Sequence, residues 1–153
     1  MLKRSLMLLC FIVIGACESD DGGQSLENVI VELNSTVVSG NWQVSSFIDS
    51  GTDETYHFDG YTFYFSQNGN LSAINGDSSI SGTWAITSDD DSADDNPGTT
   101  YDDIDFVIYF ASPEAFEDLS DDWDVLTYSS NTIELIDISG GNGGTDYLTL
   151  TKI

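Results

Sequence analysis

Residues 104–110 read IDFVIYF, and the apolar side chains Ile104, Phe106, Ile108 and Phe110 occupy every second position. Successive side chains of a β-strand point to opposite faces of the sheet, so this alternation predicts a strand with one apolar face. The same period of two continues along the chain in both directions. It indicates a fold built from strands that share one core.

The stretch upstream of these residues predicts further strands separated by tight turns. One face of each predicted strand carries Trp42, Val44, Ser46 and Ile48, then Tyr61, Phe63 and Phe65, and then Ile80, Gly82, Trp84 and Ile86. Turn signals lie at Ser50-Gly51, Asp59-Gly60, Asn68-Gly69 and Asn75-Gly76-Asp77. Asn-Gly favours a two-residue hairpin, because glycine adopts a positive φ without strain.

Downstream, Ser112-Pro113-Glu114 predicts a helical turn through Phe116 and Leu119. Ser112 is expected as its cap and Pro113 as its first residue. Strands are expected at 123–129, 132–138 and 146–152, and the glycine-rich residues 139–144 join the last two. Before the first strand, helical spacing of the apolar residues predicts a helix over 26–37, capped by Ser25 and ended by Gly40.

Eight or nine short strands joined by tight turns predict an antiparallel meander. Closing that meander into a barrel removes its unpaired edges. The predicted fold class is therefore all-β, an up-and-down antiparallel barrel of about eight or nine strands with a short N-terminal helix.

Several short motifs resemble the lipocalins. Gly40-Asn41-Trp42 resembles the G-x-W signature that opens a lipocalin barrel, and Gly82-Thr83-Trp84, Trp123-Asp124-Val125 and the ending 148–152 are similar to lipocalin-like domains of Bacteroidota lipoproteins. The resemblance spans residues 26–153. It implies a barrel whose tryptophan packs across the closed bottom, sometimes with a cavity for a small apolar ligand.

The chain departs from this family in its cations. Lipocalins commonly stack an arginine near the chain end on the G-x-W tryptophan, but no arginine follows Arg4 here. Lys152 is expected to lie over Trp42 as a weaker cation–π partner. A smaller or differently closed barrel is the alternative.

The N-terminus predicts export and lipidation. Residues 1–16 have a short basic region, an apolar core and small residues before Cys17, which is the layout of a secretory signal. Residues 14–17, Ile-Gly-Ala-Cys, resemble a bacterial lipobox, whose cysteine carries the lipid. The expectation is a signal over 1–16, a lipidated acidic tether over 17–25 and a barrel domain over 26–153, with an ordinary signal peptide as the alternative.

The acidic run at residues 18–23 resembles an export tag of surface lipoproteins. We therefore expect an outer-membrane lipid-anchored protein, with exposure at the cell surface and a plain acidic tether left as alternatives. Cys10 would leave with the signal and Cys17 would be consumed by lipid. No cysteine would then remain for a disulfide, a nucleophile or a thiolate metal site.

The charge of the chain restricts its partners. All 27 acidic residues follow position 17, and Lys152 is the only lysine or arginine beyond Arg4. Such a surface repels phosphate, which argues against nucleic-acid binding, and it repels anionic headgroups, so the lipid anchor is the only expected membrane contact. Neutral, apolar or cationic partners and metal ions remain, and solubility alone is the other explanation of the charge.

No motif for catalysis is present, and the prediction is a non-enzymatic protein with no catalytic residue and no metal site. His57 is expected on a strand, sharing a face with Asp59 and flanked by Glu54. Residues 88–105 are rich in carboxylates, so calcium is the one cofactor they suggest, with a solvated acidic loop as the favoured alternative.

Two functions follow from these observations. The leading prediction is binding of a small apolar or amphipathic ligand lined by Trp42, Phe63, Phe65, Trp84 and Phe106. With Phe110 and Trp123 these make seven large rings, which by volume favour a filled interior over a hollow one. The alternative is a surface module of the inhibitor or adhesin type that binds cationic proteins, with charge steering the encounter.

Overall fold

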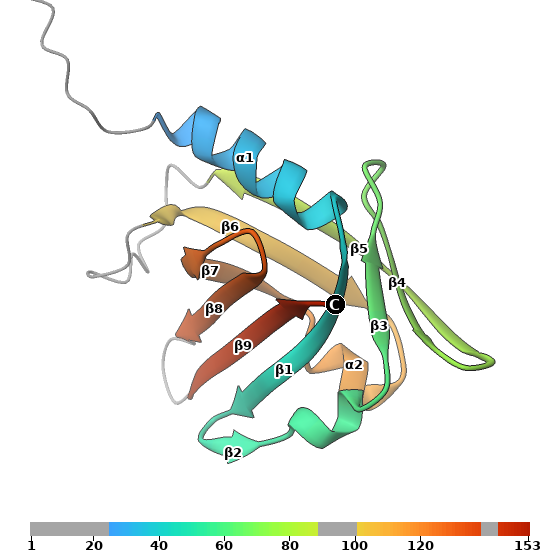
Figure 1. The fold of residues 1–153 in the computed structure, drawn as a ribbon. Coiled ribbons are helices and arrows are strands. Elements are labelled where there is room, and N and C mark those ends of the chain that lie inside the picture. The colour runs from blue at the N-terminus through green and yellow to red at the C-terminus, as the bar shows by residue number, and fades with distance from the viewer. Residues whose placement is uncertain (1–24, 89–100, 139–143) are drawn as a thin grey trace, which may run out of the picture.

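The computed structural model describes residues 25–88, 101–138 and 144–153 and shows a mostly β fold (Figure 1). The helical segments in these ranges are α1 (Leu26–Val38), the 3-10 helix η1 (Thr55–Phe58) and α2 (Glu114–Glu117). The strands are β1 (Asn41–Asp49), β2 (Thr52–Asp53), β3 (Thr62–Phe65), β4 (Asn70–Asn75), β5 (Ser78–Ser88), β6 (Tyr101–Phe110), β7 (Asp121–Tyr128), β8 (Thr132–Ile138) and β9 (Thr145–Lys152).

The strands form the predicted closed barrel. From β3 to β9 each strand pairs antiparallel with the next, β1 pairs with β3, and the pairing of β1 with β9 closes the ring. This is an eight-strand up-and-down barrel, with the two-residue β2 added beside β1. Gly69 has a φ of 82° in the β3–β4 turn, as the Asn68-Gly69 signal predicts.

The first strand departs from the predicted alternation. Phe47 is buried, whereas Ser46 and Ile48, which the sequence places on the inner face, are only partly buried. The β1–β9 register shifts between Val44 and Ser46, so the strand contains a β-bulge. One extra residue in a strand moves the side chains that follow it in that strand to the opposite face of the sheet. The prediction for Ser46 and Ile48 is therefore wrong, and Phe47 joins the core.

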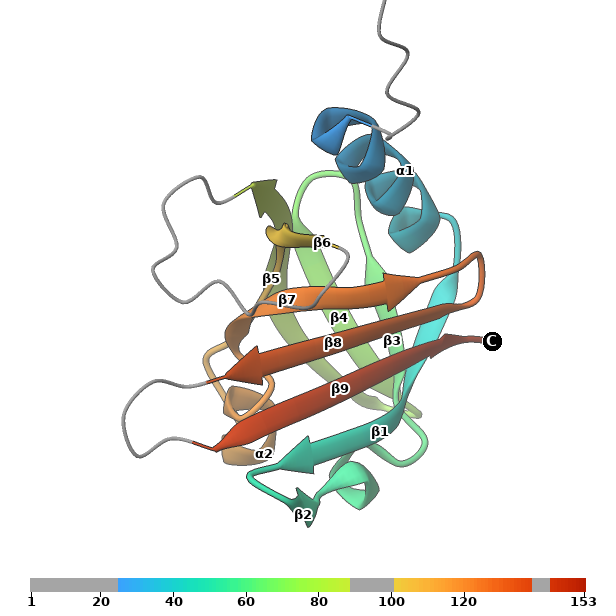
Figure 2. The ribbon, with the colours of Figure 1, turned by 90° about the vertical axis from the view of Figure 1, so that its left-hand side faces the viewer.

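Helix α1 covers one end of the barrel, which we call the α1 end (Figures 1 and 2). Its buried face carries Val29, Leu33 and Val37, in agreement with the predicted helical spacing. The indole N–H of Trp42 donates a hydrogen bond of 2.8 Å to the Val37 carbonyl. Ser25 precedes the helix without a side-chain capping bond, so its predicted capping role is wrong.

Lys152 lies across the start of β1. It pairs with Trp42 in the β1–β9 ladder, and its Nζ lies 5.5 Å from the centroid of the Trp42 ring, which confirms the predicted cation–π contact. The same Nζ donates a hydrogen bond of 2.9 Å to Ser39 Oγ. A Cβ on Gly40 would overlap the Lys152 side chain, so a larger residue at this position would force Lys152 to move.

The opposite end of the barrel, which we call the mouth, is closed by η1 and α2 (Figures 1 and 2). The rings of Phe58 and Phe116 meet edge to face with centroids 5.3 Å apart. Helix α2 starts at Glu114, because Pro113 has extended backbone angles and occupies the cap position. The predicted roles of Ser112 as cap and Pro113 as first helical residue are therefore wrong.

The interior of the barrel is one continuous hydrophobic core. The buried apolar side chains of this core are at most 8% exposed, and no buried polar or charged residue occurs among those described. Fully burying one such side chain contributes roughly 1.5–3 kcal/mol, so the rings and aliphatic chains supply the main stabilising free energy. The described core therefore needs no disulfide to explain its cohesion.

Candidate binding surfaces

The five rings predicted to line a ligand site all lie inside the barrel. Their exposed fractions do not exceed 6%; they are Trp42, Phe63, Phe65, Trp84 and Phe106. The structure brings three of them together, since Phe65 lies 5.4 Å from Trp84 and 5.8 Å from Phe106 between ring centroids. Those distances are van der Waals contacts between aromatic rings, so space between them is already occupied.

The remaining two rings, Trp42 and Phe63, are opposite each other in the β1–β3 ladder but contact elements at different ends of the barrel. Trp42 is at the α1 end, and Phe63 stacks on Phe116 at the mouth with centroids 6.0 Å apart. None of the five lines any of four hollows on the surface of the described residues. A ligand held by these rings would therefore require them to move apart.

The mouth carries a hollow of about 380 Å³ between η1, α2 and the end of β1, which we call the acidic cleft. Four carboxylates line it, together with two rings and Ala115: Asp49, Glu54, Tyr56, His57, Glu114 and Asp118. No lysine or arginine lies among these lining residues. The cleft is thus a cavity of one sign of charge beside aromatic surface.

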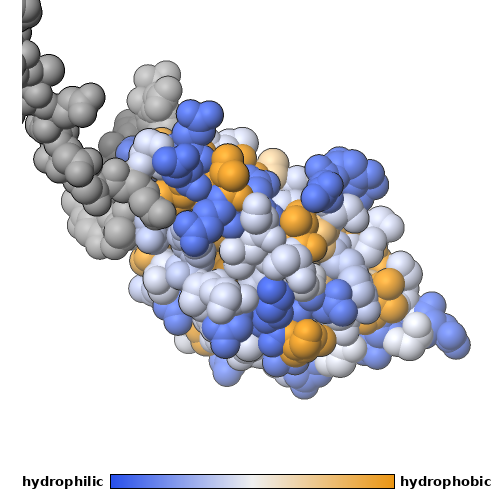
Figure 3. Space-filling view, turned by 45° about the horizontal axis from the view of Figure 1, so that its top comes forward, coloured by the Kyte–Doolittle hydropathy of each residue, from blue (hydrophilic) through white to orange (hydrophobic). Residues whose placement is uncertain are grey.

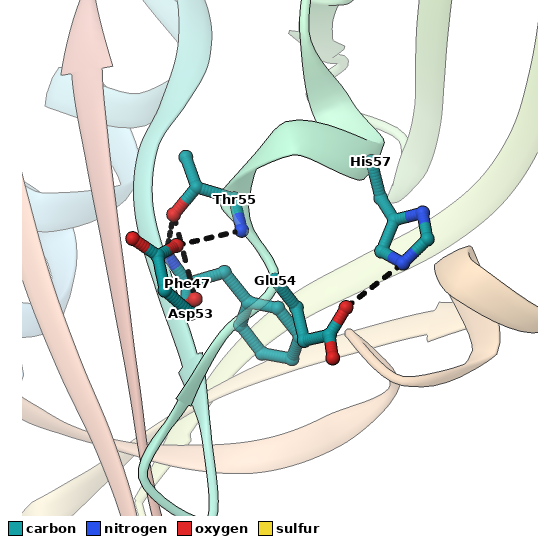
Figure 4. A network of polar contacts seen from close by, with 5 residues as sticks. All are labelled: Phe47, Asp53, Glu54, Thr55 and His57. Atoms are coloured by element: carbon teal, nitrogen blue, oxygen red, sulfur yellow. Dashed lines mark hydrogen bonds and ion pairs between the residues drawn. The ribbon is translucent and has the colours of Figure 1, made fainter.

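Local hydrogen bonds hold η1 in place at the edge of this cleft (Figure 4). The Phe47 N–H donates to Thr55 Oγ1 at 2.8 Å, and the Thr55 N–H donates to the Asp53 carboxylate at 3.0 Å. The bonds from the Thr55 side chain and backbone lower the pKa of Asp53. This network fixes the turn from which Glu54, Tyr56 and His57 project.

His57 does not lie on a strand as predicted. It belongs to the 3-10 helix η1, where residues three apart eclipse, and its Nε2 lies 2.9 Å from the Glu54 carboxylate (Figure 4). The predicted shared face with Asp59 is therefore wrong, and the ring of Tyr56 packs against His57 with centroids 4.1 Å apart. Tyr56 is 62% exposed and offers its ring to solvent.

The electrostatics of the acidic cleft favour a positive guest. Burial raises the pKa of Asp118, and the neighbouring carboxylates of Asp49, Glu114 and Glu54 raise it further, against an opposing effect of His57. Carboxylates that lie close together oppose one another's ionisation. A positive group placed in the cleft would relieve this repulsion.

A second acidic group lies nearby, where β7 begins. Burial raises the pKa of Asp121 to about 6, with contributions from Asp122 and Asp137. Asp121 lines a separate, open hollow of about 440 Å³ on the outer face of β6 with Val107 and Tyr109. The mouth end of the barrel therefore carries carboxylates on more than one side.

Metal binding has no support within the described residues, where no group of three His, Cys, Asp or Glu side chains is placed to hold an ion. The predicted calcium region falls largely on residues 89–100, which lie outside those described. In the parts of the chain that the structure covers, no helix is long and apolar enough to span a membrane.

The sequence did not single out the acidic cleft. Its residues come from three separate segments, and the packing of Phe58 against Phe116 helps to bring η1 and α2 together. In a chain with 27 acidic residues, chance carboxylate pairs hide any local signal. The one sequence signal for the cleft is the spacing of three between Glu54 and His57, which would bring them together on a helix. The sequence predicts a strand at this position instead.

Comparison with known proteins gives a limited result. No protein-family model matches the sequence, and no curated protein matches it. Two solved chains match; one of them is a DUF4847 family protein from Bacteroides vulgatus ATCC 8482. The match has 16% identity and a TM-score of 0.46, and it covers 78% of this chain and 96% of the other. The likeness concerns the barrel and carries no argument about function.

Proposed function

We propose that this protein is a non-enzymatic, lipid-anchored protein of the outer membrane that binds cationic proteins through the acidic cleft at its mouth. The single observation that carries the proposal is the lining of that cleft, with four carboxylates, Tyr56 and His57 and no lysine or arginine. A lysine or arginine side chain of a partner fits this chemistry, since it can pair with carboxylates and lie over an aromatic ring.

Charge outside the cleft supports the same proposal. The only lysine beyond the signal, Lys152, is engaged at the α1 end by Trp42 and Ser39. The mouth therefore presents acidic groups without a nearby lysine or arginine among its lining residues. A field of one sign steers oppositely charged partners and raises their rate of association. Lipidation of Cys17 would hold the protein at the membrane while the mouth stays available.

The prediction of a small apolar ligand remains as a second proposal. A closed barrel with an aromatic interior has the chemistry to bind an apolar ligand. The contacts among Phe65, Trp84 and Phe106, however, leave the described interior filled. Binding would have to separate these rings, at the cost of the packing between them. The cleft needs no such rearrangement, and we therefore prefer it.

The experiment that tests the proposal titrates the full chain with lysozyme, a basic protein, by calorimetry at low and high salt. The cleft variant replaces Glu114 by Gln and Asp118 by Asn, and the matched control replaces Asp77 by Asn and Glu134 by Gln. Both variants remove two negative charges, and both control residues are exposed outside the cleft.

We expect binding that weakens steeply as salt rises from about 0.05 M to about 0.3 M, because added ions screen the attraction. The cleft variant should lose at least about ten-fold in affinity, as expected when two charge-assisted contacts are removed, and the control should lose far less. Equal losses in both variants, or affinity that salt does not change, would contradict a cleft-specific site.

A further inference from the structure

The α1 end carries a second hollow, of about 290 Å³, between the helix and the tips of two strands. Its lining consists of Glu32, Thr36, Tyr101, Tyr128, Ser129 and Ser130. We infer that this hollow is a binding site for a small organic ammonium group, whether carried on a lipid headgroup or free in solution. The inference is independent of the acidic cleft, which lies at the opposite end of the barrel.

Three elements bring the lining residues together. Glu32 and Thr36 are four residues apart on α1, so they lie on one face of the helix. Tyr101 begins β6 and Tyr128 ends β7, and their rings lie 5.4 Å apart between centroids at an interplanar angle of 48°. The two tilted rings form one wall, and the helix supplies a carboxylate opposite them.

This combination suits a positive organic group. The faces of tyrosine rings are electronegative and attract ammonium groups, and a neighbouring carboxylate adds a full negative charge. Burial of Tyr128 is the main reason its pKa is raised, and Glu32 adds to the rise both by its charge and by accepting a hydrogen bond from the Tyr128 hydroxyl. That hydrogen bond holds the carboxylate of Glu32 beside the ring wall.

The surroundings separate an ammonium ligand from other classes. Glu32 and the excess of acidic residues oppose phosphate and carboxylate ligands, so an anion is disfavoured. Figure 3 shows that the apolar surface of the described residues near α1 is scattered among hydrophilic surface, and this part of the surface does not favour a large apolar partner. Thr36, Ser129 and Ser130 supply hydroxyls, which leaves a neutral sugar as the competing ligand for the test.

The experiment titrates the full chain with choline and follows the ring resonances of Tyr101 and Tyr128 by NMR. We expect saturable shifts of both rings. Glu32→Gln should weaken choline binding by about ten-fold, and Tyr101→Leu by at least about three-fold, which is the usual effect of one exposed cation–π contact. Tyr128→Phe keeps the ring and should weaken binding less than Tyr101→Leu does.

The control variant is Glu27→Gln, which removes one exposed charge from the same helix outside the hollow. It should leave the affinity for choline within about two-fold, because a distant exposed charge contributes little. Equal weakening by Glu27→Gln and Glu32→Gln would overturn the site, as would shifts of the two rings with glucose and none with choline.

A second arm identifies the source of the ammonium group. It compares free choline with micelles of lysophosphatidylcholine at equal headgroup concentration. Stronger binding to the micelles assigns the site to a lipid headgroup, and stronger binding to choline assigns it to a free solute; both results support the ammonium site. Absence of any shift with either probe would overturn it.

Discussion

The two ends of the barrel close the same core by different means. At the α1 end, a 13-residue helix buries three aliphatic side chains, and Trp42 and Lys152 tie it to β1 and β9. At the mouth, two single helical turns meet through Phe58 and Phe116, and carboxylates surround them. The comparison shows that Lys152, the only lysine among the described residues, takes part in packing at the α1 end, whereas the mouth keeps its carboxylates without a lysine or arginine in the cleft lining.

The largest expected effect tests the α1 end. Trp42→Ala removes a fully buried ring and its hydrogen bond to Val37, so we expect a loss of about 3–5 kcal/mol in the free energy of unfolding, measured by urea denaturation. Trp42→Phe keeps a ring and should cost less. A loss below about 1 kcal/mol for the alanine variant would show that the helix is held mainly by other contacts.

The matching change at the mouth is Phe116→Ala. Removing this ring leaves a cavity beside Phe58 and Phe63, and we expect a loss of about 3 kcal/mol. Amide exchange should rise in η1 and α2, while α1 stays protected, because α1 lies at the opposite end of the barrel from the new cavity. Faster exchange across α1 as well would mean that the ends are not independent.

Gly40→Ala tests the contribution of Lys152 and should have a smaller effect on the free energy of unfolding. The new methyl group overlaps the Lys152 side chain, which must move away from Trp42, so we expect a loss of about 1 kcal/mol. The Lys152→Ala variant lacks the side chain that the new methyl group would overlap. Adding Gly40→Ala to that variant should therefore lower the free energy of unfolding only slightly. Additive losses in the double variant, measured by the same denaturation, would place the strain elsewhere.

Replacing Asp121 should have the smallest effect on the free energy of unfolding, and this effect should depend on pH. Its pKa of about 6 lies above its ordinary value of 3.8, so the folded chain holds this proton more tightly than the unfolded chain does. Stability from this group is therefore present at low pH and falls as pH rises from about 4 through about 6. Asp121→Asn should lack this fall.

At pH 7 the asparagine variant should be the more stable by less than about 1 kcal/mol, because solvent screens a partly exposed group. Below pH 4 the difference should vanish. Exposed Asp77→Asn serves as the control, and thermal unfolding across pH is the measurement. If the asparagine variant remained the more stable protein at low pH, the charge of Asp121 would not be the cause of the difference.

The barrel was predictable because its signals are local. Alternation in β6, the Asn68-Gly69 turn and the helical spacing in α1 each depend on neighbouring residues, and the structure confirms all three. The bulge in β1 was not predictable, because Phe47 and Ser46 exchange faces through pairing with β9, which is distant in sequence.

The binding surfaces were less predictable than the fold. The five rings chosen from the sequence do lie inward, but whether an interior is hollow depends on how rings from different strands meet. Both hollows proposed as sites combine residues from segments far apart in sequence, such as Glu32 with Tyr128 and Glu54 with Asp118. The charges of those residues were visible in the sequence, whereas their proximity was not.

The measurement that bears most directly on the filled interior is native mass spectrometry of the full chain purified from the cells that produce it. We expect the mass of the protein with its lipid anchor and nothing further, since Phe65, Trp84 and Phe106 occupy the space a ligand would need. The contradicting result would be an additional mass that is lost on denaturation, and whose retention requires the barrel rings but not Glu32 or the acidic cleft. It would show that the barrel is not filled and would make binding of a small apolar ligand the leading function.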